Sequence, residues 1–410
     1  GIQHIFAAFG GIIVVPLVIA SALGLDVKTT TALISATILA SGLATIIQAR
    51  GVGKIGSRVA CIMGTDFTFV SPSISVGTVL GLPGIIGATI LGAFLEIILS
   101  FFIKPLMKLF PPLVTGTVVC LIGLTLLPVA IDWAAGGSGA VNYGDLKNIS
   151  IAGIVLIITL ILNIYGKGMI SSASILIGMI IGYIICIPLG MVDFTQVQTA
   201  SWIALPTFMP VKMEFNLEAI IAMGIMFIAT TVETVGDVSG ITNGGLDREA
   251  TSEELQGGVL ADGLGSVVAS LFGVLPNTSF SQNVGLVSVT KVVNRFTIMT
   301  GAIFLILCGF CPKLSALFAV MPQSVLGGAA VIMFASILVS GIQSLMRVEF
   351  NERNTLIIAL AIGLGIGIGQ VPTVLAQLPS WVGNIFAQNG IIMTFVIATV
   401  LNLILPGKKD

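Results

Sequence analysis

The chain has 410 residues, of which 56% are hydrophobic and only 9% are charged, and its formal net charge is −1. A soluble protein of this length exposes far more charge, so the composition indicates a polytopic membrane protein whose solvent is the lipid bilayer. The near-zero net charge and the lack of a basic run argue against a nucleic-acid partner. Because the first residue is Gly1 rather than methionine, we expect the natural N-terminus to be longer.

Apolar stretches of the length that a helix needs to cross a bilayer, about 17 to 25 residues, recur along the chain. They lie near 2–20, 31–49, 84–104, 111–130, 149–165, 170–190, 217–240, 255–274, 296–311, 323–343, 354–371 and 389–406. Two further segments, 58–75 and 276–293, are long enough to span but are interrupted by polar residues, glycine and proline. With these two, the sequence predicts an all-α membrane protein with fourteen transmembrane segments.

The basic residues divide unevenly between the two sets of connections. If the first span runs outward, 13 of the 17 basic residues fall on the cytoplasmic side, namely Arg50, Lys54, Arg58, Lys104, Lys108, Lys167, Arg248, Lys291, Arg295, Arg347, Arg353, Lys408 and Lys409. This is the positive-inside pattern, and a miscount by one span would have scrambled it. We therefore predict a multi-pass protein of the cell (inner) membrane with both termini in the cytoplasm.

The two halves of the chain resemble each other at a displacement of 211 residues. The Pro-x-x-Val-x-Gly motif that begins at Pro111 recurs at Pro322, and Phe69 in the first broken segment corresponds to Phe280 in the second. A duplicated unit of seven spans has an odd number of crossings, so its two copies must have inverted topology. Broken spans 3 and 10, one in each copy, then indicate a transporter site near the bilayer midplane.

Ionisable side chains at membrane depth are costly, so each one is a functional candidate. Those predicted at such depth are His4, Asp66, Glu96, Glu233, Asp237 and Asp262. Glu233 and Asp237 are four residues apart, so on a helix they share one face with Thr230. Both cannot be comfortably ionised in a low dielectric, so at least one is a candidate to exchange a proton. Alternatively, neighbouring polar groups neutralise both and they only hold helices together.

The other ionisable groups have less specific surroundings. Asp262 lies near the start of its span and suits a structural role as well as a functional one. His4 is the single histidine of the chain, and a lone membrane histidine is more typical of packing than of proton transfer. Glu96 lies among apolar residues, which favours an inter-helix hydrogen bond or a dimer contact.

The two broken segments leave backbone groups that must be satisfied inside a protein-lined cavity. If short extended stretches run into half-helices, the positive helix ends point at a bound electron-rich group. The first segment adds Asp66, Thr68 and Phe69, and the second adds the amides of Gln282 and Asn283. These groups together suit a small, flat, polar heterocycle. The alternative is that Gln282 and Asn283 only cap a broken helix.

The run from Gln282 to Thr290, Gln-Asn-Val-Gly-Leu-Val-Ser-Val-Thr, matches a known signature. It resembles the Gln/Glu-Asn-x-Gly-x-x-x-x-Thr motif of the nucleobase-ascorbate transporters, a family of nucleobase-cation symporters that includes bacterial xanthine and uric acid permeases. His4 after a glutamine, Glu233 in the eighth span and Asp262 in the ninth are similar to other landmarks of that family. The resemblance covers essentially the whole chain.

The resemblance implies fourteen spans in two inverted seven-span repeats, with spans 3 and 10 broken, divided into a core and a gate domain. The core would comprise 1–110 (spans 1–4) and 211–315 (spans 8–11). The gate would comprise 111–210 (spans 5–7) and 316–410 (spans 12–14), and would also form the contact of a homodimer. The core would move against the gate in alternating access, driven by proton uptake, with no other cofactor and no metal.

The resemblance also implies the site residues and the substrate. It places substrate between the domains, held by Glu233, Gln282, Asn283 and Phe69, with Thr68 and Ser281 beside them. Candidates for proton coupling or a structural polar role are Asp262, Asp237, His4 and Asp66. Family members for uracil carry glutamate at the position of Gln282, so an oxidised purine, xanthine or uric acid, is favoured. Xanthine-selective relatives tend to carry asparagine at the position of Thr68, so this residue slightly favours urate, or both xanthine and urate, as the substrate.

The alternatives to this interpretation are two other kinds of transporter and an intramembrane enzyme. A uracil or other nucleobase permease of the same family is the first, and an anion transporter of the sulfate-permease type, which lacks the Gln-Asn-x-Gly signature, is the second. A metalloprotease needs His-Glu-x-x-His, which one histidine cannot supply. An intramembrane aspartyl protease needs Gly-x-Gly-Asp, whereas Asp237 follows Thr-Val-Gly. The lone Cys308-x-x-Cys311 pair suits packing better than metal or redox chemistry. We therefore expect a transporter and no enzymatic activity.

Overall fold

The computed structural model describes residues 1–387 and 389–406, and Lys408 and Lys409, two of the basic residues predicted to be cytoplasmic, lie outside these ranges. In the first half of the chain the helices are α1 (Ile2–Ala22), α2 (Val27–Arg50), α3 (Val70–Leu99), α4 (Ile103–Leu109), α5 (Pro112–Ala134), α6 (Leu146–Tyr165), α7 (Met169–Ser172), α8 (Ser174–Cys186) and α9 (Thr195–Thr199). In the second half they are α10 (Leu217–Leu246), α11 (Ser252–Leu271), α12 (Ser281–Thr290), α13 (Arg295–Gly309), α14 (Pro312–Ala319), α15 (Gln323–Leu345), α16 (Glu352–Gln370), α17 (Ser380–Val382) and α18 (Gly390–Ile404). The shorter turns and strands are η1 (Phe67–Phe69), η2 (Ser100–Phe102), η3 (Pro372–Leu375), η4 (Gly383–Ala387), β1 (Met63–Thr65) and β2 (Asn277–Ser279).

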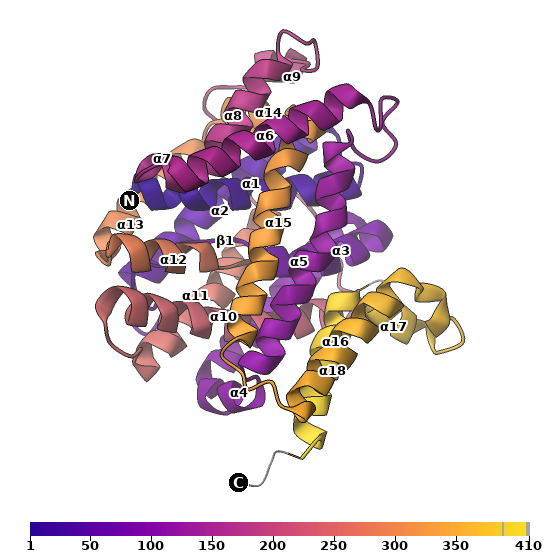
Figure 1. Ribbon diagram of the computed structural model, residues 1–410. Coiled ribbons are helices and arrows are strands. Elements are labelled where there is room, and N and C mark those ends of the chain that lie inside the picture. The colour runs from indigo at the N-terminus through magenta and orange to yellow at the C-terminus, as the bar shows by residue number, and fades with distance from the viewer. Residues whose placement is uncertain (388, 407–410) are drawn as a thin grey trace.

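The helices pack in two sets that meet along α1 (Figure 1). In one set α2 packs on α13, and α3 packs on both α10 and α11. In the other set α5 packs along α15, α15 also packs on α6, and α16 packs on α18. Figure 1 shows α5 and α15 side by side, with α16, α17 and α18 projecting from the body near the C-terminal end. Elements from the two halves of the sequence are therefore neighbours in both sets.

Helices α5 and α15 approach closely because small residues face the contact. A methyl group built on Gly123 would lie 2.5 Å from the backbone nitrogen of Leu338, and one built on Gly341 would lie 2.4 Å from that of Cys120. Such distances leave no room for a side chain, so glycine is required at both positions. Small residues at a helix contact are how membrane helices gain van der Waals packing without a hydrophobic driving force.

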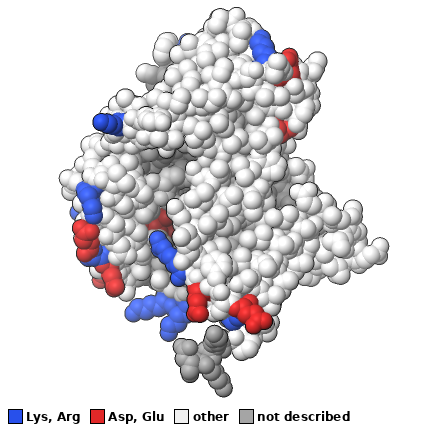
Figure 2. All heavy atoms as spheres, viewed as in Figure 1, with Lys and Arg blue, Asp and Glu red and all other residues white. Residues whose placement is uncertain are grey.

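Many of these helices have the length and composition of a membrane span. Among the described residues, 8 helices are long and apolar enough to cross a bilayer, or up to 10 if each bent helix pair is taken as one span. Figure 2 shows a surface that is largely free of charge, with the charged side chains gathered mainly along its lower edge. The protein is therefore a multi-pass membrane protein, as its composition predicts. The count of fourteen spans stays a prediction.

The predicted third and fourth spans are joined in one bent element. Helix α3 continues from the first broken segment to Leu99, but Gly81 within it has the non-helical angles φ 66° and ψ −166°. Only glycine adopts this conformation readily, and Pro83, two residues later, cannot continue the hydrogen bonding of the preceding turn. The element Val70–Leu99 therefore consists of two helices joined by a kink at Gly81.

Both broken segments contain a strand of three residues, and the two strands pair with each other. Strands β1 and β2 are antiparallel, with Gly64 opposite Thr278 at the centre of the register. All of their residues are buried. The segments therefore cross in the protein interior rather than at its surface, and each continues at once into a helix.

The outer edges of these strands are satisfied by hydroxyl groups. Thr45 on α2 accepts a hydrogen bond from the Met63 backbone nitrogen at 2.9 Å and donates to the Met63 carbonyl at 3.3 Å. Ser266 on α11 likewise accepts from the Asn277 backbone nitrogen at 3.0 Å and donates to its carbonyl at 2.9 Å. Because an isolated pair of strands is marginal and buried backbone groups need partners, these two side chains hold the crossing in place.

Candidate functional site

Two helices begin where the strands end, and both begin at residues that the repeat aligns. Phe69 is the N-cap residue of α3 and Phe280 is the N-cap residue of α12. Pro111 and Pro322, the other aligned pair, are the N-cap residues of α5 and α15. The displacement of 211 residues found in the sequence thus brings equivalent positions to equivalent helix starts.

Glu233 on α10 lies between the starts of the two broken-segment helices. Its Oε2 accepts a hydrogen bond from the Thr68 hydroxyl at 3.3 Å, and its Oε1 accepts one from the Ser281 hydroxyl, also at 3.3 Å. The side chain is half-buried, whereas Thr68 is buried. One carboxylate therefore contacts both broken segments at the point where their helix N-termini leave unpaired N–H groups.

Asp66 caps the short helix η1, which leads into α3. It is the N-cap residue of η1, and its Oδ1 accepts from the Thr68 backbone nitrogen at 2.7 Å. A carboxylate at this position stabilises the first turn by bonding a backbone donor that has no intrahelical partner. The structure thus gives Asp66 a capping contact, next to the bond between Thr68 and Glu233.

A network of hydroxyl groups lies behind Glu233. Asp262 on α11 accepts hydrogen bonds at Oδ2 from Thr234 and, at 2.9 Å, from Thr278. Asp237 accepts at Oδ2 from Ser279 at 2.6 Å. All these side chains are buried. Strand β2 thereby connects two acids that come from different helices.

The sequence did not single out Thr234, Thr278 or Ser279. Thr278 and Ser279 lie in the predicted broken segment, and Thr234 follows Glu233 directly, so position alone gave a weak signal. The sequence alone does not show how β2 is aligned against α10 and α11. That alignment decides which hydroxyl reaches which carboxylate.

Asn283 and His4 bond to each other and to the first broken segment. His4 Nδ1 lies 2.9 Å from Asn283 Oδ1, and Asn283 Nδ2 donates to the Ala60 carbonyl at 2.6 Å. Because an amide oxygen only accepts, His4 carries its proton on Nδ1 in this arrangement. Its Nε2 lies 3.3 Å from the Thr290 hydroxyl. Both polar ends of Asn283 are therefore used to tie α12 to α1 and to the segment before β1.

Gln282 differs from its neighbour, because its side chain is exposed. No hydrogen bond from its amide to another residue is found within the described ranges. The two adjacent amides of the signature therefore have different surroundings. Asn283 is committed to internal contacts, and Gln282 is free to meet a ligand.

The ring of Phe69 is buried in the protein rather than presented to a cavity. Only 1% of Phe69 is exposed, and its ring centroid lies 4.7 Å from that of Phe227 on α10. The neighbouring Phe67 packs edge-on against Phe334 of α15 at 5.5 Å. Any contact of Phe69 with substrate in this conformation would have to use its backbone.

Glu96 does not form a dimer contact, and that alternative is wrong. The side chain is fully buried on α3, where its Oε1 accepts from Thr230 at 3.2 Å and from Thr231 at 3.4 Å on α10. The other alternative from the sequence, an inter-helix hydrogen bond, is confirmed.

The two sets of helices also meet beside the start of α3. The Ser71 hydroxyl donates to Asn389 Oδ1 at 3.2 Å, and Asn389 is buried at the start of α18. A cavity of about 180 Å³ opens beside Ser71, between the first turns of α3 and the later part of α5. This opening lies only three residues along the chain from Thr68.

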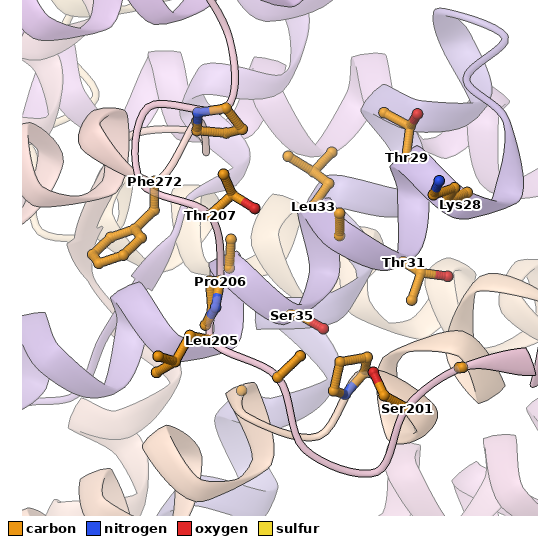
Figure 3. A pocket seen from close by; sticks show the side chains of 18 of the residues that line it. Lys28, Thr29, Thr31, Leu33, Ser35, Ser201, Leu205, Pro206, Thr207 and Phe272 are labelled. Carbon is orange, nitrogen blue, oxygen red and sulfur yellow. The ribbon is translucent and has the colours of Figure 1, made fainter.

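A larger cavity, of about 590 Å³, lies away from the acids. Figure 3 shows Leu33 and Ser35 of α2 on one side of it and the connection with Leu205, Pro206 and Thr207 on another. Its lining includes none of the predicted site residues. In the part of the chain that is described, no three His, Cys, Asp or Glu side chains are grouped to hold a metal ion, and Cys308 and Cys311 are free thiols.

Apolar helices, a buried crossing of two broken segments and a row of buried acids define a multi-pass membrane transporter. Residues 1–374 match the model of the Permease family. Three similar curated proteins have names of permeases or transporters. A candidate purine permease of Clostridium perfringens is 57% identical over 99% of this chain and 89% of its own length, and the xanthine permease of Bacillus subtilis is 39% identical over 98% and 92%. The uric acid transporter UacT of Escherichia coli is 37% identical over 100% and 86%.

The chain therefore belongs to this permease family of xanthine and uric acid permeases, the bacterial nucleobase-ascorbate transporters, and it is a transporter rather than an enzyme. Solved structures show the same fold at low identity. The transmembrane domain of the cyanobacterial bicarbonate transporter BicA aligns with a TM-score of 0.59 over 98% of this chain and 97% of that one, at 14% identity. SLC26A9 aligns with a TM-score of 0.63 over 100% and 66%, at 12% identity.

Proposed function

We propose that this protein is a proton-coupled symporter that imports an oxidised purine, xanthine and/or uric acid, by alternating access. The observation that carries the proposal is the position of Glu233, whose carboxylate contacts Thr68 and Ser281 at the starts of both broken-segment helices. The names of the Bacillus subtilis and Escherichia coli relatives support a purine as the substrate. A purine ring of this kind carries N–H donors and C=O acceptors around one flat edge.

The polar groups at the two helix starts match such an edge. Glu233 can accept N–H protons from the purine, which would replace the Thr68 and Ser281 hydroxyls as donors. The exposed Gln282 offers both an N–H₂ donor and a C=O acceptor. The N-termini of α3 and α12 add backbone N–H groups and the positive ends of two helix dipoles for the purine oxygens. Asn283, with both ends bonded internally, would support the site by fixing α12.

The buried acids make a proton the reasonable coupling ion. Asp237 and Asp262 bond to hydroxyl groups on β2, the strand that leads into Ser281. A proton gained or lost by one of these acids would change the hydrogen bonding of the segment that carries the substrate contacts. His4 and Asp66 have a supporting structural role in this scheme. His4 on α1 bonds to Asn283 on α12, and Asp66 caps η1 within the first broken segment.

Fourteen crossings in two inverted repeats fit the helices described. This number follows if α3 counts as two spans because of its kink at Gly81, the bent pairs count as one span each, and α8, α11 and α12 are added to the long apolar helices. The antiparallel pairing of β1 and β2 suits inverted copies, since equivalent segments then run in opposite directions. The core would comprise 1–110 and 211–315, and the gate 111–210 and 316–410, with a homodimer formed through the gate and both termini in the cytoplasm of the inner membrane.

The proposal is tested by uptake of labelled xanthine, urate and uracil into purine-uptake-deficient cells, with and without a protonophore. We expect saturable uptake of xanthine or urate that falls when the proton gradient is collapsed. Purine uptake that persists unchanged with protonophore would refute proton coupling. Uptake of uracil alone would instead favour a uracil permease of the same family.

Two variants test the site itself. Glu233→Gln should stop transport, and normal purine accumulation in a well-expressed variant would contradict the role of Glu233. Gln282→Glu should abolish or redirect purine recognition, because it replaces an amide donor with a second carboxylate close to Glu233. Wild-type purine affinity in that variant would remove Gln282 from the site. Glu253→Gln, on the exposed first turn of α11, is the matched control and should transport normally.

A further inference from the structure

Glu96 is a fully buried carboxyl that the proposed site does not use. It lies on α3 where this helix packs against both α10 and α11. The contact with α11 is tight, because a methyl group built on Gly263 would lie 2.9 Å from the Ala93 carbonyl oxygen and 3.1 Å from the Ile97 nitrogen. Glu96 is thereby enclosed at a junction of three helices, and Asp262 directly precedes Gly263 on the α11 side of this contact.

The hydrogen bonds around Glu96 can accommodate a carboxyl that carries a proton. The Thr231 hydroxyl lies 2.7 Å from the Phe227 carbonyl, closer than the 3.4 Å that separates it from Glu96 Oε1. A hydroxyl has one proton, and when Thr231 donates it to Phe227 its oxygen is free to accept from a protonated Glu96. Thr230 has the same choice, since it lies 3.2 Å from Glu96 and 3.2 Å from the Phe227 carbonyl.

The helices packed against Glu96 carry two further acids. Asp262 lies on α11, and Glu233 lies on α10 three residues beyond Thr230. The ion pairs of the described chain, Arg248 with Glu254 and Lys291 with Asp247, are elsewhere and exposed. Glu96 Oε2 is buried and, like Asp262 Oδ1, makes no hydrogen bond within the described residues. An unpaired charge so placed would be very costly, whereas a neutral carboxyl is not.

We propose that Glu96 is a proton-holding group that forms, with Asp262, a buried carboxyl pair in which at most one member is ionised at a time. This rests on the proposed proton coupling, and it adds a residue to it. Through the pair, Glu96 sets the pH range over which Asp262 and Glu233 release and regain a proton. It lies one turn of α10 from the proposed substrate contact, because its partner Thr230 precedes Glu233 by three residues.

The first test is infrared spectroscopy of the purified protein in lipid, which records the C=O stretching band of protonated carboxyl groups in H₂O and D₂O. Glu96→Gln should remove one component of this band, and Glu253→Gln should not. If the Glu96→Gln protein does not fold, Thr231→Val provides the same information, because it should shift the band by removing a hydroxyl partner of Glu96. An unchanged band in the folded variant would overturn the proposal.

The second test is the pH profile of purine uptake. With Glu96→Gln the half-maximal point should move to higher pH, by about 0.3 unit for two equal sites, because the pair can lose its first proton from either carboxyl whereas the variant can lose it only from Asp262. A purely structural role would lower uptake at every pH without moving this point, and that result would overturn the proposal. A wild-type uptake that is insensitive to protonophore would defeat the proposed symport, while the infrared result would still report the proton on Glu96.

Discussion

Replacing Gly64 with alanine should destabilise the crossing of the two broken segments. A methyl group at this position would lie 2.4 Å from Phe280 Cε2 and 2.9 Å from Ile12 Cγ1. Carbon atoms in contact prefer about 3.5 to 4.0 Å, so the Phe280 ring would have to move by roughly 1 Å. It has little room to do so, because its other edge lies against Gly11 of α1, where a methyl group would be 2.7 Å from Phe280 Cε1.

Overpacking of this kind costs about 1 to 3 kcal/mol when the surroundings cannot yield. We expect Gly64→Ala to lower the thermal midpoint of the purified protein and to lower uptake, because Phe280 immediately precedes Ser281. Gly363→Ala on α16, where a methyl group meets nothing within 4 Å, is the matched control and should be neutral or slightly stabilising. Combining Gly64→Ala with Phe280→Leu should recover part of the loss. A Gly64→Ala protein as stable and active as the control would refute the reasoning.

Two further changes test the hydroxyl network and a surface ion pair. Thr234→Val keeps the shape of the side chain but takes a hydroxyl donor from Asp262, so it should cost about 1 to 3 kcal/mol and reduce uptake, and an unchanged thermal midpoint would count against the network. Arg248 holds the pKa of Glu254 below its usual range, so the pair stabilises the protein above about pH 4.3, the unfolded value, and this contribution is lost as pH falls through the lowered pKa. Removing it with Glu254→Gln should cost less than about 1 kcal/mol near neutral pH, with less effect in acid, whereas Glu253→Gln should change nothing at either pH.

The sequence predicted those parts of the molecule that follow from local chemistry. Polar interruptions in two apolar stretches indicated the broken segments, and the repeat displacement aligned Phe69 with Phe280 at two helix starts. Glu233 was chosen for its carboxylate at membrane depth, and the structure brings it to Thr68 and Ser281. Each of these inferences depends on residue type and spacing along one segment.

What the sequence could not predict depends on how distant segments pack. The ring of Phe69 was expected in the pocket, but it packs against Phe227, which is 158 positions later in the chain. Asn283 and His4 were candidates on separate grounds, and their bond to each other depends on the placement of α12 beside α1. The sequence left two roles open for Glu96, an inter-helix hydrogen bond or a dimer contact, and only the packing of α3 on α10 decides between them. Contacts of this kind are set by the tertiary fold rather than by local pattern.

The hydrogen bonds that hold the two crossing strands limit which parts of the protein can move separately. Thr45 and Ser266 each bond both backbone groups of one strand residue, and they come from α2 and α11, which pack on each other. Moving either broken segment alone would leave buried backbone groups unpaired, at about 1 to 3 kcal/mol for each group. By contrast, the bond from Ser71 to Asn389, which joins the two sets of helices near the site, links two side chains and leaves no backbone group unpaired when it breaks. The transport motion we propose should therefore carry both broken segments, with Glu233 between them, as one body against the α5 and α15 side.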